Sequence, residues 1–146
     1  MVTLIVLFIS LLVFRGLGVL GVPLFLTWHD CALWALAVMI LFTASAHFTA
    51  LKEDLIKMVP KFFPFPRQIV FVTGLLEIAG AFGLLIPQVR TAAGICLTIL
   101  FVAMFPANIN AVLRQVPLRG RPATPLWLRI PMQVLFIALA LWSALG

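Results

Sequence analysis

One acidic residue stands inside an otherwise apolar run. Residues 72–87 read VTGLLEIAGAFGLLIP, and Glu77 lies near the middle of this stretch. A carboxyl group in such surroundings can exchange protons or hold a polar ligand, since charges inside membrane spans mark functional sites. It can equally be structural, in an ion pair whose breakage would cost about 3–5 kcal/mol. The sequence leaves both roles open.

Other polar side chains recur at a spacing of four residues, which places both members of a pair on one face of a helix. The pairs are Thr43 with His47, Thr73 with Glu77 and Arg129 with Gln133, and the segment MFPANINAVL adds Asn108 and Asn110. Each set lies toward the same end of its apolar run, and the other ends of the runs are almost wholly apolar. We therefore predict that these side chains line one intramembrane polar pocket, which is the candidate ligand-binding site.

The predicted pocket contains groups that could form an ion pair. Arg129 is the expected partner of Glu77, and Arg15 is the alternative if the first apolar segment packs beside the third. His47 is expected either to hydrogen-bond a neighbouring helix or to transfer protons. Asn108 and Gln133 are expected to hold helices together through hydrogen bonds.

Composition indicates that the bilayer is the solvent of this chain. Of its 146 residues 64% are hydrophobic and 10% charged, and the mean hydropathy is +1.24. A soluble domain of this size could not bury so much apolar surface. The formal net charge is +6, but the basic residues lie in loops between apolar runs. That pattern indicates membrane topology rather than a nucleic-acid partner.

We expect an all-α membrane protein: a four-helix transmembrane bundle plus an extra N-terminal transmembrane helix, in a single domain over residues 1–146. About 20 helical residues cross the hydrocarbon core. The predicted spans are residues 2–25, 31–51, 68–86, 91–113 and 125–145. Prolines in the stretch KEDLIKMVPKFFPFPR should prevent a regular helix there. We expect an interfacial loop, with a lid over a cavity as the alternative.

Basic residues between the spans predict an orientation. Only Arg90 falls on one side of the predicted membrane. The other side collects Lys52, Lys57, Lys61, Arg67, Arg114, Arg119 and Arg121. By the positive-inside rule the N-terminus is cytoplasmic and the C-terminus outside, so the polar pocket lies toward the cytoplasm.

No motif indicates a metal or a nucleotide. Cys31 and Cys96 have no metal-ligand spacing and are expected to pack as small apolar residues. The run RGLGVLG at 15–21 fits the GxGxxG pattern, but it lacks the preceding strand that a dinucleotide site needs. Faces of small residues would permit a homodimer.

The order of several motifs resembles the DoxX-like family of small bacterial membrane proteins. Over about residues 36–140 these are AHF, MVP, FP, VTGLLEIAGAFGLLIP, FVAMFPANINAVL and TPLWLRIPMQVLFI. The resemblance implies a four-helix bundle in a bacterial inner membrane, with the N-terminal helix as an addition. It also implies a relation to quinone-linked redox subunits, from which that family takes its name. The positions that it singles out are His47, Glu77, Asn108, Arg129 and Gln133.

Two functions follow as expectations. The first is a redox-associated, quinone-linked membrane subunit or small lipophilic ligand binder, in which Glu77 or His47 exchanges protons with a quinone-like head group. The second is a non-catalytic assembly or scaffold subunit, whose basic loops dock a membrane or cytoplasmic protein partner. The sequence leaves open whether the protein is an enzyme.

Overall fold

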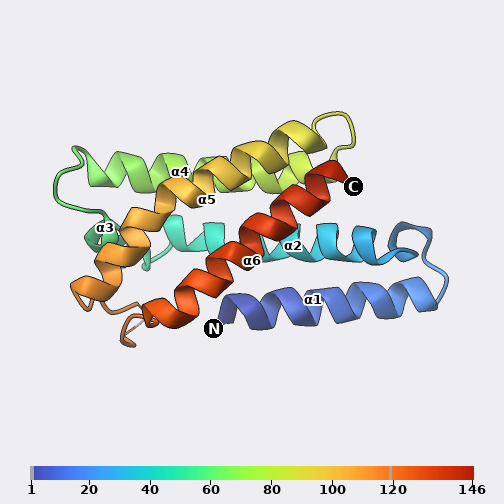
Figure 1. Cartoon of the computed structure of the whole chain (residues 1–146), viewed down its shortest axis with the longest axis horizontal. Coiled ribbons are helices and arrows are strands. Elements are labelled where there is room, and N and C mark those ends of the chain that lie inside the picture. Colours follow the sequence, from blue (N-terminus) through green and yellow to red (C-terminus); the bar gives the residue numbers. More distant parts are fainter. Residues whose placement is uncertain (1, 119) are drawn as a thin grey trace.

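Helices make up nearly all of the regular structure in the computed structural model, which describes residues 2–118 and 120–146. Within these ranges, five helices are long and apolar enough to span a membrane. They are α1 (Val2–Val19), α2 (Trp28–Ala44, continued by the 3-10 turn Ser45–His47), α4 (Pro66–Leu85), α5 (Arg90–Leu113) and α6 (Leu126–Leu145), shown in Figure 1. The predicted all-α membrane fold is confirmed.

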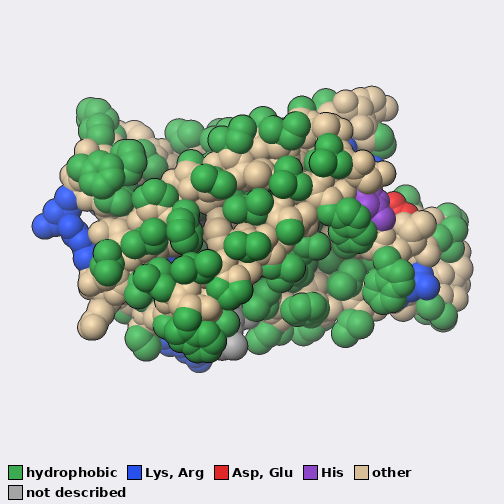
Figure 2. All heavy atoms as spheres, in the orientation of Figure 1, with side chains coloured by type: hydrophobic (Ala, Val, Ile, Leu, Met, Phe, Trp, Pro, Cys, Tyr) green, Lys and Arg blue, Asp and Glu red, His purple; other side chains and the backbone are tan. Residues whose placement is uncertain are grey.

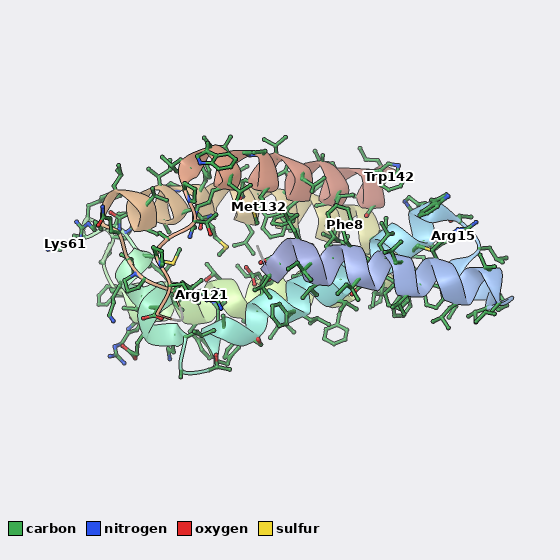
Figure 3. The ribbon with its side chains drawn as sticks, turned by 90° about the horizontal axis from the view of Figure 1, so that it is seen from below. Phe8, Arg15, Lys61, Arg121, Met132 and Trp142 are labelled. Atoms are coloured by element: carbon green, nitrogen blue, oxygen red, sulfur yellow. The ribbon has the colours of Figure 1, made fainter. Side chains whose placement is uncertain are left out.

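Four of these helices form a closed ring. Neighbours around the ring are α2 and α4, α4 and α5, α5 and α6, and α6 and α2. Therefore α4 and α6 occupy diagonal corners. Helix α1 packs on α2 outside the ring, and its N-terminal end lies about halfway along the long axis (Figures 1 and 3). The bundle of four with an added N-terminal helix is as expected.

The bundle has two ends that differ in charge. We call the end formed by α3 (Lys52–Met58), residues 59–65, residues 114–118 and residues 120–125 the basic end. It lies at the left of Figure 1, and the connections at 20–27 and 86–89 lie at the other end, the far end. Arg119, one of the basic residues used to predict orientation, falls outside the described residues.

Two helix boundaries differ from the predicted spans, for local reasons. The first helix ends at Val19 rather than residue 25, because Gly21 takes φ 93° and Pro23 opens a separate 3-10 turn. The second begins at Trp28 rather than residue 31. There Thr27 is the N-cap, and its hydroxyl accepts a hydrogen bond from the Asp30 amide at 3.1 Å. The second helix and its 3-10 turn end at His47 rather than at residue 51.

The stretch predicted to lack a regular helix contains one. Helix α3 has acids in its first turn (Glu53, Asp54) and Lys57 in its last, an arrangement that suits the helix dipole. The prolines act only after Met58. They keep residues 59–65 irregular, and Pro66 then begins α4, where its fixed φ is favourable.

Apolar packing is divided into two clusters. The larger fills the far half of the ring; its buried members are Leu7, Ala35, Leu36, Ala37, Met39, Ile40, Ala81, Leu84, Leu97, Phe101 and Ala140. The smaller lies at the basic end and contains Met58, Ala111 and Val116. Along α5, Asn108 falls between the two clusters. The polar residues of the other ring helices likewise begin where the larger cluster stops.

Close contact between α5 and α6 generates a prediction. A Cβ atom at Gly94 would overlap the Ala144 side chain and lie 2.8 Å from the Ala140 carbonyl oxygen. We expect Gly94→Ala to lower the free energy of unfolding by about 1–3 kcal/mol, because backbone atoms cannot move aside. The measurement is the melting temperature in detergent.

The matched control is Gly16→Ala in α1, where a Cβ would have no atom within 4 Å. That change should leave the melting temperature unchanged or raise it, since Ala favours helix by about 1 kcal/mol over Gly. Equal melting temperatures for the two variants would contradict the packing described for α5 and α6.

Candidate functional site

A histidine and a glutamate meet between α2 and α4. His47 lies in the 3-10 turn that ends the second span, and Glu77 lies near the middle of α4. Both are buried, with 4% of each residue exposed. Imidazole Nε2 is 3.8 Å from carboxyl Oε2. Of the ion-pair contacts within 4.0 Å among the described residues, this one joins two spans.

A backbone hydrogen bond fixes the orientation of the imidazole. Nδ1 of His47 is 2.6 Å from the carbonyl oxygen of Val70 in α4. A carbonyl can only accept, so Nδ1 carries a proton and donates it. The second ring nitrogen, Nε2, faces Glu77. A further proton can therefore reside on Nε2 or on the carboxyl group, which stand 3.8 Å apart and so make an electrostatic contact without a hydrogen bond.

Two threonines complete this group, which we call the α2–α4 cluster (Thr43, His47, Thr73 and Glu77). The Thr73 hydroxyl lies 3.4 Å from His47 Nδ1 and donates to the Ile69 carbonyl at 2.9 Å. The Thr43 side chain interacts with the Glu77 carboxyl group. Oε2 of Glu77 is buried but has no hydrogen-bond partner among the described residues. This oxygen is the one that lies 3.8 Å from Nε2 of His47.

Gly74 makes the close contact between α4 and His47 possible. This residue was not identified from the sequence. A Cβ at this position would lie 2.5 Å from Cβ and 2.7 Å from Cγ of His47. The α4 backbone can approach the imidazole only because residue 74 has no side chain. A glycine one turn before Glu77, on the same face, was the signal that could have identified it.

The remaining candidates lie elsewhere. In the α5–α6 cluster (Asn108, Arg129 and Gln133), Nη1 of Arg129 donates to Oδ1 of Asn108 at 2.8 Å, and Nε donates to the Thr124 carbonyl at 3.0 Å. Gln133 donates to the Phe101 carbonyl at 2.6 Å. The candidates thus form two clusters on opposite sides of the ring.

Asn110 belongs to neither cluster. Its amide donates to the Met58 carbonyl at 2.8 Å and so ties α5 to the end of α3. The amide therefore joins two elements of the basic end.

The expected ion pairs of Glu77 are absent from the described part of the chain. Arg129 is directed to Asn108 because α6 stands diagonally across the ring from α4. Arg15 lies at the far end, as Figure 3 shows, where it donates to the Leu26 carbonyl at 2.8 Å and lies over the Trp28 ring. The charged neighbour of Glu77 is His47.

An apolar groove leads to the α2–α4 cluster. Its volume is about 340 Å³, and its lining residues are Pro64, Phe65, Gln68, Ile69, Val72 and Thr73. Val72 and Phe65 are exposed, so the groove opens on the outer surface of α4. Thr73 belongs both to this groove and to the cluster. Its hydroxyl therefore connects the outer surface with His47.

Comparison with known proteins gives one match. The model of a family described as a domain of unknown function, DUF8561, matches residues 36–144. No curated protein and no solved structure is significantly similar to the chain. The matched range begins within α2 and therefore leaves α1 outside.

The contact at Gly74 predicts a local effect. We expect Gly74→Ala to push His47 away from Val70, weaken the Nδ1 hydrogen bond and reduce the free energy of unfolding by about 1–3 kcal/mol. Nitrogen NMR of a histidine-labelled sample would report the Nδ1 bond, and a melting curve the stability. An unchanged His47 signal would contradict the close approach, and Gly16→Ala again serves as control.

The two clusters predict opposite effects of charge removal. Glu77→Gln should leave the melting temperature unchanged or raise it, because no arginine loses a partner. Arg129→Gln should lower the free energy of unfolding by about 1–3 kcal/mol, because the Asn108 oxygen and the Thr124 carbonyl lose their donor. Both are measured in detergent at neutral pH. A large drop for Glu77→Gln would instead show that its carboxylate is structural.

Proposed function

The chain belongs to the DUF8561 family, whose description assigns no function, and we propose from the site itself that it binds a small lipophilic ligand of quinone type within the membrane. The observation that carries this proposal is the buried contact between His47 and Glu77, connected through Thr73 to an apolar groove on the outer surface of α4.

The groove suits the apolar part of such a ligand. Its volume of about 340 Å³ lies within the range of small-molecule sites, roughly 300–1,000 Å³. It opens on a helix face that lipid would surround, so a lipophilic molecule can enter sideways from the bilayer. Thr73 lines this groove, and its hydroxyl oxygen can accept from a hydroxyl head group; to donate to a carbonyl head group, the hydroxyl proton must turn away from the Ile69 carbonyl.

Behind Thr73, the α2–α4 cluster can supply or accept a proton. The bond to Val70 holds one proton on Nδ1 of His47, and a second proton can reside on Nε2 or on the nearby Glu77 carboxyl group. A polar head group needs such donors, because hydrocarbon offers none. In a redox-associated role, this chain contributes the ligand site and the proton, and a partner redox protein exchanges the electrons.

We propose further that the protein lies in a bacterial inner membrane with its N-terminus in the cytoplasm and its C-terminus outside. The described basic residues support this, since six lie at the basic end: Lys52, Lys57, Lys61, Arg67, Arg114 and Arg121. Arg15 and Arg90 lie at the far end. The larger number predicts the cytoplasmic side.

The likeness to DoxX-like proteins stays part of this proposal. It spans nearly the same residues as the family match, and both leave α1 outside. That agreement supports α1 as an addition to a four-helix unit.

The alternative proposal is a non-catalytic assembly subunit. It is favoured by two exposed phenylalanines at the basic end, Phe62 (76% exposed) and Phe65 (69%), which could contact a protein partner. A stable partner retained in mild detergent, without any ligand-dependent change in stability, would support this alternative.

A binding experiment tests the ligand proposal. Decylubiquinone, a quinone with a short tail, should raise the melting temperature of the protein in detergent, because a ligand that binds only the folded state stabilises it. Thr73→Val and Val72→Trp should reduce this rise, since one removes the hydroxyl and the other fills the groove. Leu75→Trp, on an exposed position of α4 outside the groove lining, should not.

Infrared spectroscopy supplies the proton readout. Quinone binding should change the carbonyl-stretch band of a protonated carboxyl group, and Glu77→Gln should abolish the change. The proposal fails if the wild-type protein gains no stability, or if Val72→Trp and Leu75→Trp behave alike.

A further inference from the structure

A second pocket lies at the basic end, between α3, the segment that follows it and the end of α5. Its volume is about 470 Å³. The residues that line it are Ile56, Lys57, Val59, Pro60, Lys61, Phe63, Pro66, Arg114 and Val116. None of them lines the groove beside Thr73, so this pocket is separate from the proposed ligand site.

The walls of this basic pocket are held together by packing and by a hydrogen bond. Met58, Ala111 and Val116 form the smaller apolar cluster beneath it. The Asn110 amide donates to the Met58 carbonyl and joins α5 to α3. The pocket is therefore a built feature of the fold.

The charged side chains that line the basic pocket are all positive. Lys57, Lys61 and Arg114 line the pocket, and no acidic residue does. Asp54 approaches Lys57 from outside the lining, at 3.6 Å from Nζ. That lysine side chain is 62% exposed, so the pair is screened by water and weak. Figure 2 shows Lys and Arg side chains gathered at this end, and Figure 3 shows Lys61 at its tip.

The position along the bundle matches the edge of a bilayer. Pro66 begins α4 and Leu113 ends α5, so the pocket sits where two spans stop. The exposed Phe62 and Phe65 lie in the same segment between α3 and α4 that supplies part of the pocket lining. Lipid phosphates lie at this level, directly next to acyl chains.

We propose that the basic pocket binds the phosphate group of an anionic phospholipid. The three cations hold the phosphate, and the apolar side chains of Ile56, Val59 and Phe63 contact the glycerol and the first acyl carbons. Basic pockets between spans suit such head groups, and each cation near the membrane surface adds to the attraction for an anionic lipid. A free phosphate ion would use the cations but gain nothing from the apolar lining, so we assign the site to lipid.

Native mass spectrometry of the full chain in mild detergent tests the assignment. The probes are phosphatidylglycerol, phosphatidylcholine with the same acyl chains, and inorganic phosphate. We expect phosphatidylglycerol to bind the wild-type protein in preference to both others. Replacing the pocket cations together (Lys57→Gln, Lys61→Gln, Arg114→Gln) should weaken this binding at least about tenfold.

The control removes the same charge from the same end, outside the pocket: Lys52→Gln, Arg67→Gln and Arg121→Gln. It should change the affinity by less than about twofold, because only pocket cations touch the phosphate. Equal losses in the two triple variants would overturn the proposal, since they would show attraction to general surface charge. Equal binding of inorganic phosphate would overturn the assignment to lipid.

A second measurement uses the unmodified protein and so does not depend on folding of a variant. Phosphatidylglycerol with a photoreactive group near its head should label residues 56–66 and 114–116. Labelling confined to other segments would contradict the proposal.

Discussion

Hydrogen bonding inside a hydrocarbon solvent is the constraint on which this structure depends. A polar side chain within a span has no water to bind, so it must find its partner in the protein. Thr73 donates to the Ile69 carbonyl, Gln133 to Phe101 and Asn110 to Met58. In each case the acceptor is a backbone carbonyl. Gln133 and Asn110 thus link neighbouring helices, whereas Thr73 bonds a carbonyl of its own helix.

Glu77 departs from this rule, and the departure distinguishes its cluster from the other. Arg129 and Asn108 satisfy each other, whereas one oxygen of Glu77 lacks a hydrogen bond within the described chain. A buried acid with an unsatisfied oxygen lowers the stability of the folded protein, and no evident structural role of Glu77 offsets this loss. Such exceptions are typical of sites kept for binding or chemistry. The argument for a ligand therefore starts from this oxygen.

Much of the architecture could be predicted from the sequence, because apolar run length and helical spacing report on single helices. The run lengths predicted five spans, and the spacing predicted that the polar residues of different spans lie toward the same end of the bundle. They could not give the partner of Arg129, since spacing defines the face of a helix but not the corner that the helix occupies.

The sequence patterns also failed to predict two features of local backbone geometry. Helix α3 formed because its charges suit both of its ends, although the prolines beyond it suggested an irregular stretch. Gly74 was overlooked because its role depends on His47, 27 positions earlier in the chain. Contacts between distant residues leave no periodic signal, so neither feature could be derived from spacing.

The attachment of α1 has a consequence for how this protein could change its assembly. Detaching a helix from a bundle within lipid exposes little apolar surface to water, because acyl chains take the place of the side chains that packed against it. What retains α1 is therefore shape: the rings of Phe14, Phe25 and Trp34 interlock, and Arg15 is tied to Leu26. Both fastenings lie at the far end. The N-terminal half of α1 is held by apolar contact alone, chiefly through the buried Leu7, so a neighbouring transmembrane helix could replace that half at low cost.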